Sequence, residues 1–331
     1  GTARATFAGG AAAAQRGDVE QIGVGARHAD PPPGEWATAI EVRALPLPRV
    51  LLYDAWQRLR HPVVERATGP VDLVHATAHV ASASRAPWVA TVHDLHFLHE
   101  PGHFTRRGMS VFRRFLELTR AEAAMVLCPS EATRRDCETA GIASDRLRVV
   151  PWATRAEPVG DDDVVRVRRT YGLDRPFVFF SGTVEPRKNL GRLLEAFDRL
   201  GPVHADLVLA GPEGWREDLP ATRARRLGFV PRADLDALYA AADVVCYPSL
   251  REGFGLPVLE AMVQGAAVVT SATTAPAEVA GEAGVLVDPL DVDAIADALD
   301  RLLRDPVERR PLGQAARARA ASFPRGRTAG A

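Results

Sequence analysis

The chain has 331 residues, is 47% hydrophobic and 25% charged, and carries a formal net charge of −1. This composition is typical of a globular protein with room for two domains of about 150 residues each. So small a charge produces no field that would attract nucleic acid, and no apolar run approaches the roughly 20 residues of a membrane span. Cys128, Cys137 and Cys246 are scattered and odd in number, which argues against a disulfide framework and favours the reducing cytoplasm.

The first half of the chain predicts alternating helices and strands. Residues 11–15 favour a helix, Val19 to Val24 a strand, and residues 29–34 a rigid proline loop. A helical stretch is predicted over 51–67. Further strands are predicted at 71–75, 88–93, 124–128 and 147–150.

Polar residues end the apolar strand that begins at Trp88. In open α/β sheets, ligands bind beyond the carboxyl ends of the strands, so His93 and Asp94 are placed for function. His93 also belongs to a histidine series, but a metal site needs converging ligands at tight spacing, usually with thiolates or carboxylates. The series has no cysteine partner, so we predict neither a metal site nor a cofactor.

The segment from Phe104 to Arg120 is rich in arginine and carries Phe112, Phe115 and Leu116. A basic amphipathic helix can lie on the inner, anionic face of a membrane. An ordinary surface helix, whose arginine stems cover apolar area, is the favoured interpretation. A second helix is predicted to start after Ser130, a suitable N-cap.

A linker is predicted over Pro151 to Pro158, together with the acidic residues 161–163. It separates a domain over 1–157 from a domain over 158–310, and a short terminal segment covers 311–331. Six apolar runs of the second domain predict strands at 177–181, 206–210, 226–230, 243–247, 267–270 and 284–287. Helical patterns between them predict a doubly wound parallel sheet.

The stretch from Tyr247 to Met262 predicts an anion-binding turn. A buried strand leads through Gly253 and Gly255 into a helix with Pro257 in its first turn. The first N–H groups of a helix lack intrahelical partners and lie at the positive end of its dipole, so they favour a phosphate. Glycine lets the ligand approach closely.

Charged residues accompany this turn. Glu252 precedes it and Glu260 lies behind it among apolar neighbours, where an unpaired carboxylate would be costly, so a partner is expected. Arg187 and Lys188 follow the first strand of the second domain. Cations there could stabilise the charge that develops on a leaving phosphate, although a solvated helix start would also explain them.

Two motifs together resemble a known family. Glu252 and Glu260, separated by seven residues around Gly253, Phe254, Gly255 and Leu256, follow a stretch from Gly182 to Leu190. Both resemble motifs of the family-four retaining glycosyltransferases, which have the two-domain GT-B fold. The resemblance implies two Rossmann-like domains facing a cleft, and transfer of a hexose, mannose or glucose, from a nucleotide diphosphate sugar to an acceptor hydroxyl with retention and without a metal.

The resemblance also implies roles for individual residues. Glu252 would contact the transferred sugar, Glu260 the ribose, Arg187 and Lys188 the leaving phosphates, and His93 the sugar from the first domain. The remaining positions that match donor-binding positions of the family are Gly182, Glu185, Asn189, Phe229, Gly253, Phe254, Gly255 and Leu256.

The match is poor at both ends of the chain. Only a few residues, including Gly9 and Gly10, precede the first helix, so we expect an incomplete first domain and a truncated or re-started N-terminus. The last helix is expected to be abbreviated. A catalytically inactive GT-B protein that binds a nucleotide sugar or a partner is therefore an alternative. A nucleotide-cofactor oxidoreductase is a weaker alternative, because no Gly-x-Gly-x-x-Gly follows a strand. The acceptor cannot be read from the sequence.

Overall fold

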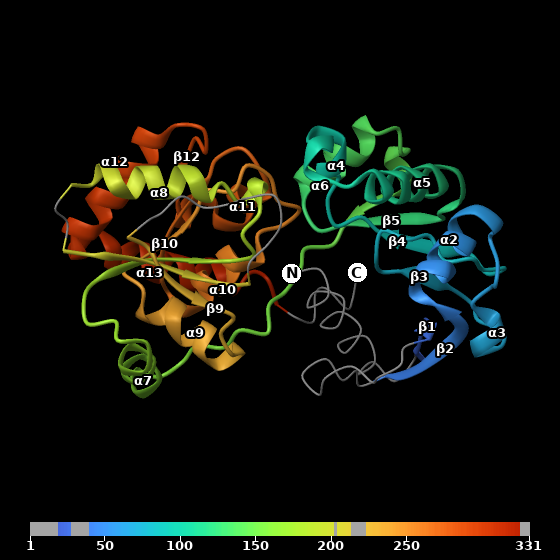
Figure 1. Cartoon of the computed structure of the whole chain (residues 1–331), viewed down its shortest axis with the longest axis horizontal. Coiled ribbons are helices and arrows are strands. Elements are labelled where there is room, and N and C mark those ends of the chain that lie inside the picture. Colours follow the sequence, from blue (N-terminus) through green and yellow to red (C-terminus); the bar gives the residue numbers. More distant parts are fainter. Residues whose placement is uncertain (1–18, 28–39, 202–203, 213–222, 325–331) are drawn as a thin grey trace. The chain divides into compact units, whose positions relative to one another are not determined.

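The computed structural model describes residues 19–27, 40–201, 204–212 and 223–324 (Figure 1). The predictions for residues 9–15 and for the proline loop at 29–34 lie outside these ranges. The described chain divides into two units, with the boundary between Ala153 and Thr154, and the second unit ends at Phe323. No helix among the described residues has the length and apolarity needed to cross a bilayer.

The first unit contains two parallel sheets. β1 (Ile22–Arg27) pairs with β2 (Glu41–Pro48). The sequence pattern does not predict β2, because its two prolines and two charged residues interrupt the apolar run. The second sheet has four strands in chain order: β3 (Val74–Ala76), β4 (Trp88–Thr91), β5 (Met125–Cys128) and β6 (Leu147–Val149). All four overlap the predicted strands.

One predicted helix of this unit is divided. The stretch at 51–67 forms α2 (Arg49–Leu59) and α3 (Glu65–Thr68), because α2 ends at the left-handed Arg60 and Pro62 cannot continue a helix. The other helical segments are α4 (His96–His99), η2 (Pro101–His103), α5 (Arg106–Glu122), α6 (Glu131–Thr139) and η3 (Ser144–Arg146). Ser130 caps α6 as predicted, accepting a hydrogen bond from the Thr133 amide.

The second unit is built on one six-stranded parallel sheet in the order β12-β11-β10-β7-β8-β9. The strands are β7 (Phe177–Ser181), β8 (Asp206–Ala210), β9 (Arg225–Gly228), β10 (Val244–Tyr247), β11 (Ala267–Ser271) and β12 (Val285–Val287). β7 and β10 are buried along their whole length, as central strands covered on both faces must be.

Helices cover both faces of this sheet (Figure 1). α8 (Leu190–Arg199) packs beside α12 (Val292–Arg304), whereas α7 (Asp161–Tyr171) packs beside α9 (Arg232–Ala241) and α9 beside α10 (Leu256–Gln264). The remaining segments are η4 (Pro186–Lys188), α11 (Ala275–Ala280), η5 (Gly281–Ala283) and α13 (Pro306–Ala320).

One segment differs from the sequence prediction. Asp161, Asp162 and Asp163 were assigned to the linker, but they form the first turn of α7, where carboxylates face the positive end of the helix dipole. The final helix α13 packs on α10 and β11 of the second unit. Arg317 of this helix donates to the Gln264 carbonyl over 2.9 Å, which ties α13 to the end of α10.

Candidate active site

The strand order of the second unit creates a switch point between β7 and β10. From β7 the chain proceeds through β8 to β9 on one side, and then returns to add β10, β11 and β12 on the other. Connections leave the carboxyl ends of β7 and β10 in opposite directions, which opens a crevice where ligands bind in such sheets. The loop after β7 contains the motif from Gly182 to Leu190, and the loop after β10 leads into the motif from Glu252 to Glu260.

Arg187, Lys188 and Glu252 meet at this point from the two loops. The Lys188 ammonium lies 2.5 Å from Glu252 Oε1, and Arg187 Nη1 lies 2.8 Å from the same oxygen. Arg187 also donates through Nε to Glu185 Oε2 over 2.8 Å. The Leu250 amide donates to the Arg187 carbonyl over 2.8 Å, so the backbones of the two loops are joined as well.

Lys188 is the only lysine among the 41 lysine and arginine residues of the chain. Its side chain is only 8% exposed. A compact ammonium offers three donors on a flexible stem, whereas a guanidinium is a wide planar fork. Of the two cations in the cluster, the more deeply buried one is thus the single lysine of the sequence.

Tyr247 completes the cluster and was not recognised as a site residue from the sequence. Its ring is fully buried at the end of β10 and stacks on Phe180, with ring centroids 5.5 Å apart. Its hydroxyl accepts a hydrogen bond from Lys188 and donates to Glu252 Oε1 over 3.1 Å. The Lys188 nitrogen also lies 4.9 Å from the centre of the Tyr247 ring. Tyr247 thus positions both charged groups.

The charges in this cluster perturb each other's protonation. Burial by itself raises the pKa of Glu252, but the positive charges of Arg187 and Lys188 outweigh it and lower that pKa to about 2. Burial lowers the pKa of Lys188, and the Glu252 carboxylate opposes this change. Glu252 is therefore ionised at neutral pH, held between two cations.

Glu260 has a protein partner that the sequence did not reveal. Arg232, from the start of α9, places Nη1 2.5 Å from Glu260 Oε1, and its Nε donates to Asp236 over 3.0 Å. Glu260 is buried on α10, so this ion pair supplies the compensation that its apolar neighbours cannot. Arg232 fixes the position of the carboxylate.

Two glycines allow the loops to approach each other. Gly255 precedes α10 with φ +103°, a left-handed conformation that other residues rarely adopt. Gly211, after β8, has φ +141°, and a Cβ atom there would lie 2.1 Å from the Gly182 carbonyl oxygen. Gly182 and Gly211 therefore bring the ends of β7 and β8 into direct contact.

The other predicted donor-binding residues differ in burial: most are buried in the loops, and one is exposed. Asn189 is left-handed, with φ 61°, and its amide donates to the carbonyls of Pro248 and Pro289 over 3.0 and 2.6 Å, so it joins three loops. Phe254 and Leu256 are buried beside the turn, in which Gly253 also lies. Phe229 is instead 66% exposed after β9, and is available to a planar ligand.

His93 lies in the first unit, at the carboxyl end of β4. Its Nε2 lies 2.7 Å from the Thr77 carbonyl, which can only accept, so Nε2 carries the proton. Burial and the neighbouring His79 lower the pKa of His93 to about 4. The neutral ring lies 5.2 Å from the Trp152 ring. Among the described residues, no group of three or more His, Cys, Asp or Glu side chains could hold a metal ion.

Solved structures with the same architecture define the class of fold. Anabaena HepE, in complex with UDP and glucose, superposes with a TM-score of 0.77 at 20% identity, covering 100% of this chain and 94% of that one. WaaG, a glycosyltransferase involved in lipopolysaccharide biosynthesis, gives 0.71 at 18% identity, covering 97% and 92%. The chain has the GT-B fold, with two Rossmann-like α/β domains, as predicted.

Sequence comparisons lead from the fold to the family. The model for Glycosyltransferase Family 4 matches residues 6–157, and the model for Glycosyl transferases group 1 matches residues 166–319. O-antigen chain mannosyltransferase B of Escherichia coli is 35% identical over 234 residues, 66% of this chain and 61% of that protein. Serotype-specific mannosyltransferase WbdA of Escherichia coli is 31% identical over 278 residues, 75% of this chain and 34% of that protein. The chain belongs to the group 1, family 4 glycosyltransferases, and it spans less than two thirds of the length of these relatives.

Proposed function

We propose that the protein transfers a hexose, mannose or glucose, from a nucleotide diphosphate sugar to an acceptor hydroxyl, with retention of configuration. The observation that carries this proposal is the convergence of Arg187, Lys188 and Glu252 at the switch point between β7 and β10. Two cations there would stabilise the negative charge that develops on the nucleoside diphosphate as its bond to the sugar breaks. The names of the mannosyltransferase relatives support mannose as the sugar.

The proposed reaction has the following course. The bond between the anomeric carbon and the diphosphate breaks, and the new bond to the acceptor oxygen forms on the same face of the sugar. The acceptor proton passes to the departing phosphate oxygen. Arg187 and Lys188 take up the charge on the diphosphate, so no metal is required in this proposal. Glu252 then accepts hydrogen bonds from the sugar hydroxyls.

The remaining residues bind the nucleotide. The first N–H groups of α10, after Gly253, Phe254 and Gly255, favour a phosphate group. Glu260, held by Arg232, accepts from the ribose hydroxyls, and Phe229 contacts the base. In the first domain, the neutral His93 contacts the sugar from the acceptor side. The three buried free thiols are compatible with a reducing cytoplasm as the site of action.

A panel of nucleotides tests the proposal. UDP, GDP, ADP, their glucose and mannose forms, and NAD are titrated into the protein by calorimetry, and slow donor hydrolysis is followed in the same samples by NMR. We expect one base to bind and the sugar form of that nucleotide to be hydrolysed slowly. Binding without hydrolysis would favour a silent nucleotide-sugar-binding protein. Binding of NAD, with none of the sugar nucleotides, would contradict the proposal.

Glu260→Ala should weaken binding of the preferred nucleotide by tenfold or more, because a hydrogen bond to a charged group contributes about 1.5–3 kcal/mol. A deoxyribose form of the same nucleotide makes the test specific for the sugar. Wild-type protein should bind it more weakly than the ribose form, whereas Glu260→Ala should not distinguish the two. Glu282→Ala, at an exposed carboxylate of the same unit, serves as the control. Equal discrimination by wild type and Glu260→Ala would argue against a ribose contact.

A further inference from the structure

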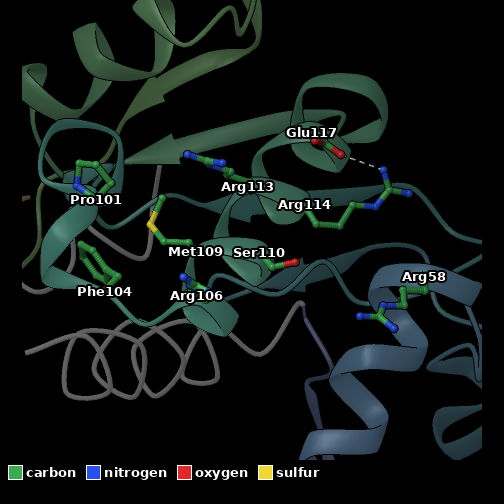
Figure 2. Close-up of a pocket in the computed structure, with 9 residues that line it drawn as sticks. All are labelled: Arg58, Pro101, Phe104, Arg106, Met109, Ser110, Arg113, Arg114 and Glu117. Atoms are coloured by element: carbon green, nitrogen blue, oxygen red, sulfur yellow. Dashed lines mark hydrogen bonds and ion pairs between the residues drawn. The ribbon is translucent and has the colours of Figure 1, made fainter.

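A charged pocket lies in the first unit, on residues that the proposed reaction does not use. It has a volume of about 620 Å³ and lies along α5, between η2 and α2. Figure 2 shows Arg58 approaching from α2 and three arginines, Arg106, Arg113 and Arg114, from α5. We call it the arginine pocket.

The positive charge of the arginine pocket is largely uncompensated. Among the described residues of its lining, Glu117 is the only carboxylate, against four guanidinium groups, so these residues together carry a formal charge of +3. Arg114 donates to Glu117 and to the Gln57 carbonyl, each over 3.0 Å. Arg58, Arg106 and Arg113 have no hydrogen-bond or ion-pair partner among the described residues, and all three are exposed. Three free guanidinium groups around one cavity repel each other unless an anion joins them.

The start of α5 adds to this imbalance. Its first turn contains no acidic residue, although the positive end of a helix dipole disfavours cations. Arg107 is neutralised by Asp54, 2.8 Å away, on the side of α2. Arg106, in the same turn, lines the pocket and has no carboxylate partner in the part of the chain that the structure describes. An anion in the pocket would therefore interact favourably with both the guanidinium groups and the helix.

The lining also has an apolar part. Phe104 and Met109 are half-buried and pack against the hydrophobic core of the first unit. The Phe104 ring contacts Phe112 edge to face, with centroids 5.6 Å apart, which fixes its orientation. An apolar group of a ligand could cover both side chains while the arginines hold its charged end.

We propose that the arginine pocket binds a discrete ligand that carries a phosphate group next to an apolar group, at a site separate from the donor site. A guanidinium binds two phosphate oxygens at once, so Arg106 and Arg113, which line the same cavity from α5, can both contribute to a phosphate site. The cavity volume lies within the range of small-molecule sites, which favours a single molecule over a flat charged surface. The proposal does not depend on glycosyl transfer.

The test measures binding of octyl phosphate, below its critical micelle concentration, by calorimetry. We expect Arg106→Gln/Arg113→Gln to weaken binding by about tenfold or more, since each substitution removes a charge-assisted hydrogen bond. Glutamine preserves helix propensity at both exposed positions, and circular dichroism verifies the fold. Arg85→Gln is the matched control, because Arg85 is an exposed arginine of the same unit outside the pocket.

Two further arms separate the pocket from other phosphate sites. Lys188→Gln removes a cation of the donor site and should leave octyl phosphate affinity within about twofold. Ethyl phosphate should bind more weakly than octyl phosphate, because it cannot cover Phe104 and Met109. A loss of affinity in Lys188→Gln but not in the pocket variant would overturn the proposal, and so would equal affinities for all variants. If the protein bound only phosphatidylglycerol vesicles and not octyl phosphate, the arginines would form a membrane-contact surface, and the proposal of a ligand pocket would be overturned.

Discussion

Lys188→Ala is expected to lower the rate of glycosyl transfer or donor hydrolysis by about 10²–10³-fold, the loss that typically follows removal of one preorganised charge-stabilising donor. The ammonium is held between Tyr247 and Glu252 before the donor arrives, so it needs no reorganisation as negative charge develops on the leaving diphosphate. The measurement is single-turnover hydrolysis of the preferred donor, with donor affinity determined separately by calorimetry.

Two variants make this result specific. Lys188→Arg keeps the charge, but a planar guanidinium cannot occupy the space of the buried ammonium, so it should recover only part of the activity. Arg169→Ala removes an exposed cation of α7 in the same unit and should have no effect. Wild-type turnover by Lys188→Ala with donor bound would show that the leaving group is stabilised elsewhere.

The unique lysine allows an independent measurement. Reductive methylation modifies primary amines, so it can react only with Lys188 and the α-amino group, because the sequence contains no other lysine. The preferred nucleotide should protect Lys188 from modification, as read by mass spectrometry. Equal modification with and without nucleotide would contradict a contact between Lys188 and the phosphates.

Glu252→Gln is expected to lower the free energy of unfolding by about 3–5 kcal/mol, because it leaves Arg187 and Lys188 without the carboxylate that they share. Glutamine has nearly the same shape as glutamate, so packing changes little and the loss reports on charge. Urea denaturation followed by circular dichroism measures it. Glu282→Gln, at an exposed carboxylate, is the control and should stay within about 0.5 kcal/mol of wild type.

The same residue predicts a dependence of stability on pH. The pKa of Glu252 is lowered to about 2 in the folded protein, so the unfolded chain binds its proton first as the pH falls. The stabilisation is complete above the unfolded pKa of about 4.3 and is lost as the pH falls through 2, a difference of about 3 kcal/mol. Glu252→Gln should lack this contribution. An identical decline for wild type and Glu252→Gln between pH 5 and 2 would contradict the charge arrangement.

The parts of the protein that could be predicted from sequence are those set by local pattern. Five-residue segments with four apolar positions predicted the limits of β7 and β8, and a polar residue in the N-cap position predicted the start of α6. The glycine turn before α10 was also visible, because a helix start with Gly255 and Pro257 depends on backbone conformation within a few residues.

Contacts between distant residues were decided only by the tertiary structure. The sequence indicated that Glu260 needs a partner, yet Arg232 lies 28 residues away on another helix. Tyr247 and Lys188 are 59 residues apart and meet only because β10 is added beside β7. Arg58 likewise joins α5 through the packing of α2. Apart from β2, the sequence by itself determined the strands, the turns and the charged residues at their ends, because these follow from local periodicity and backbone preference. Which charges neutralise each other, and which lack a partner, was decided by the order of strands and the packing of helices, since electrostatic interactions depend on distance in space and not on separation along the chain.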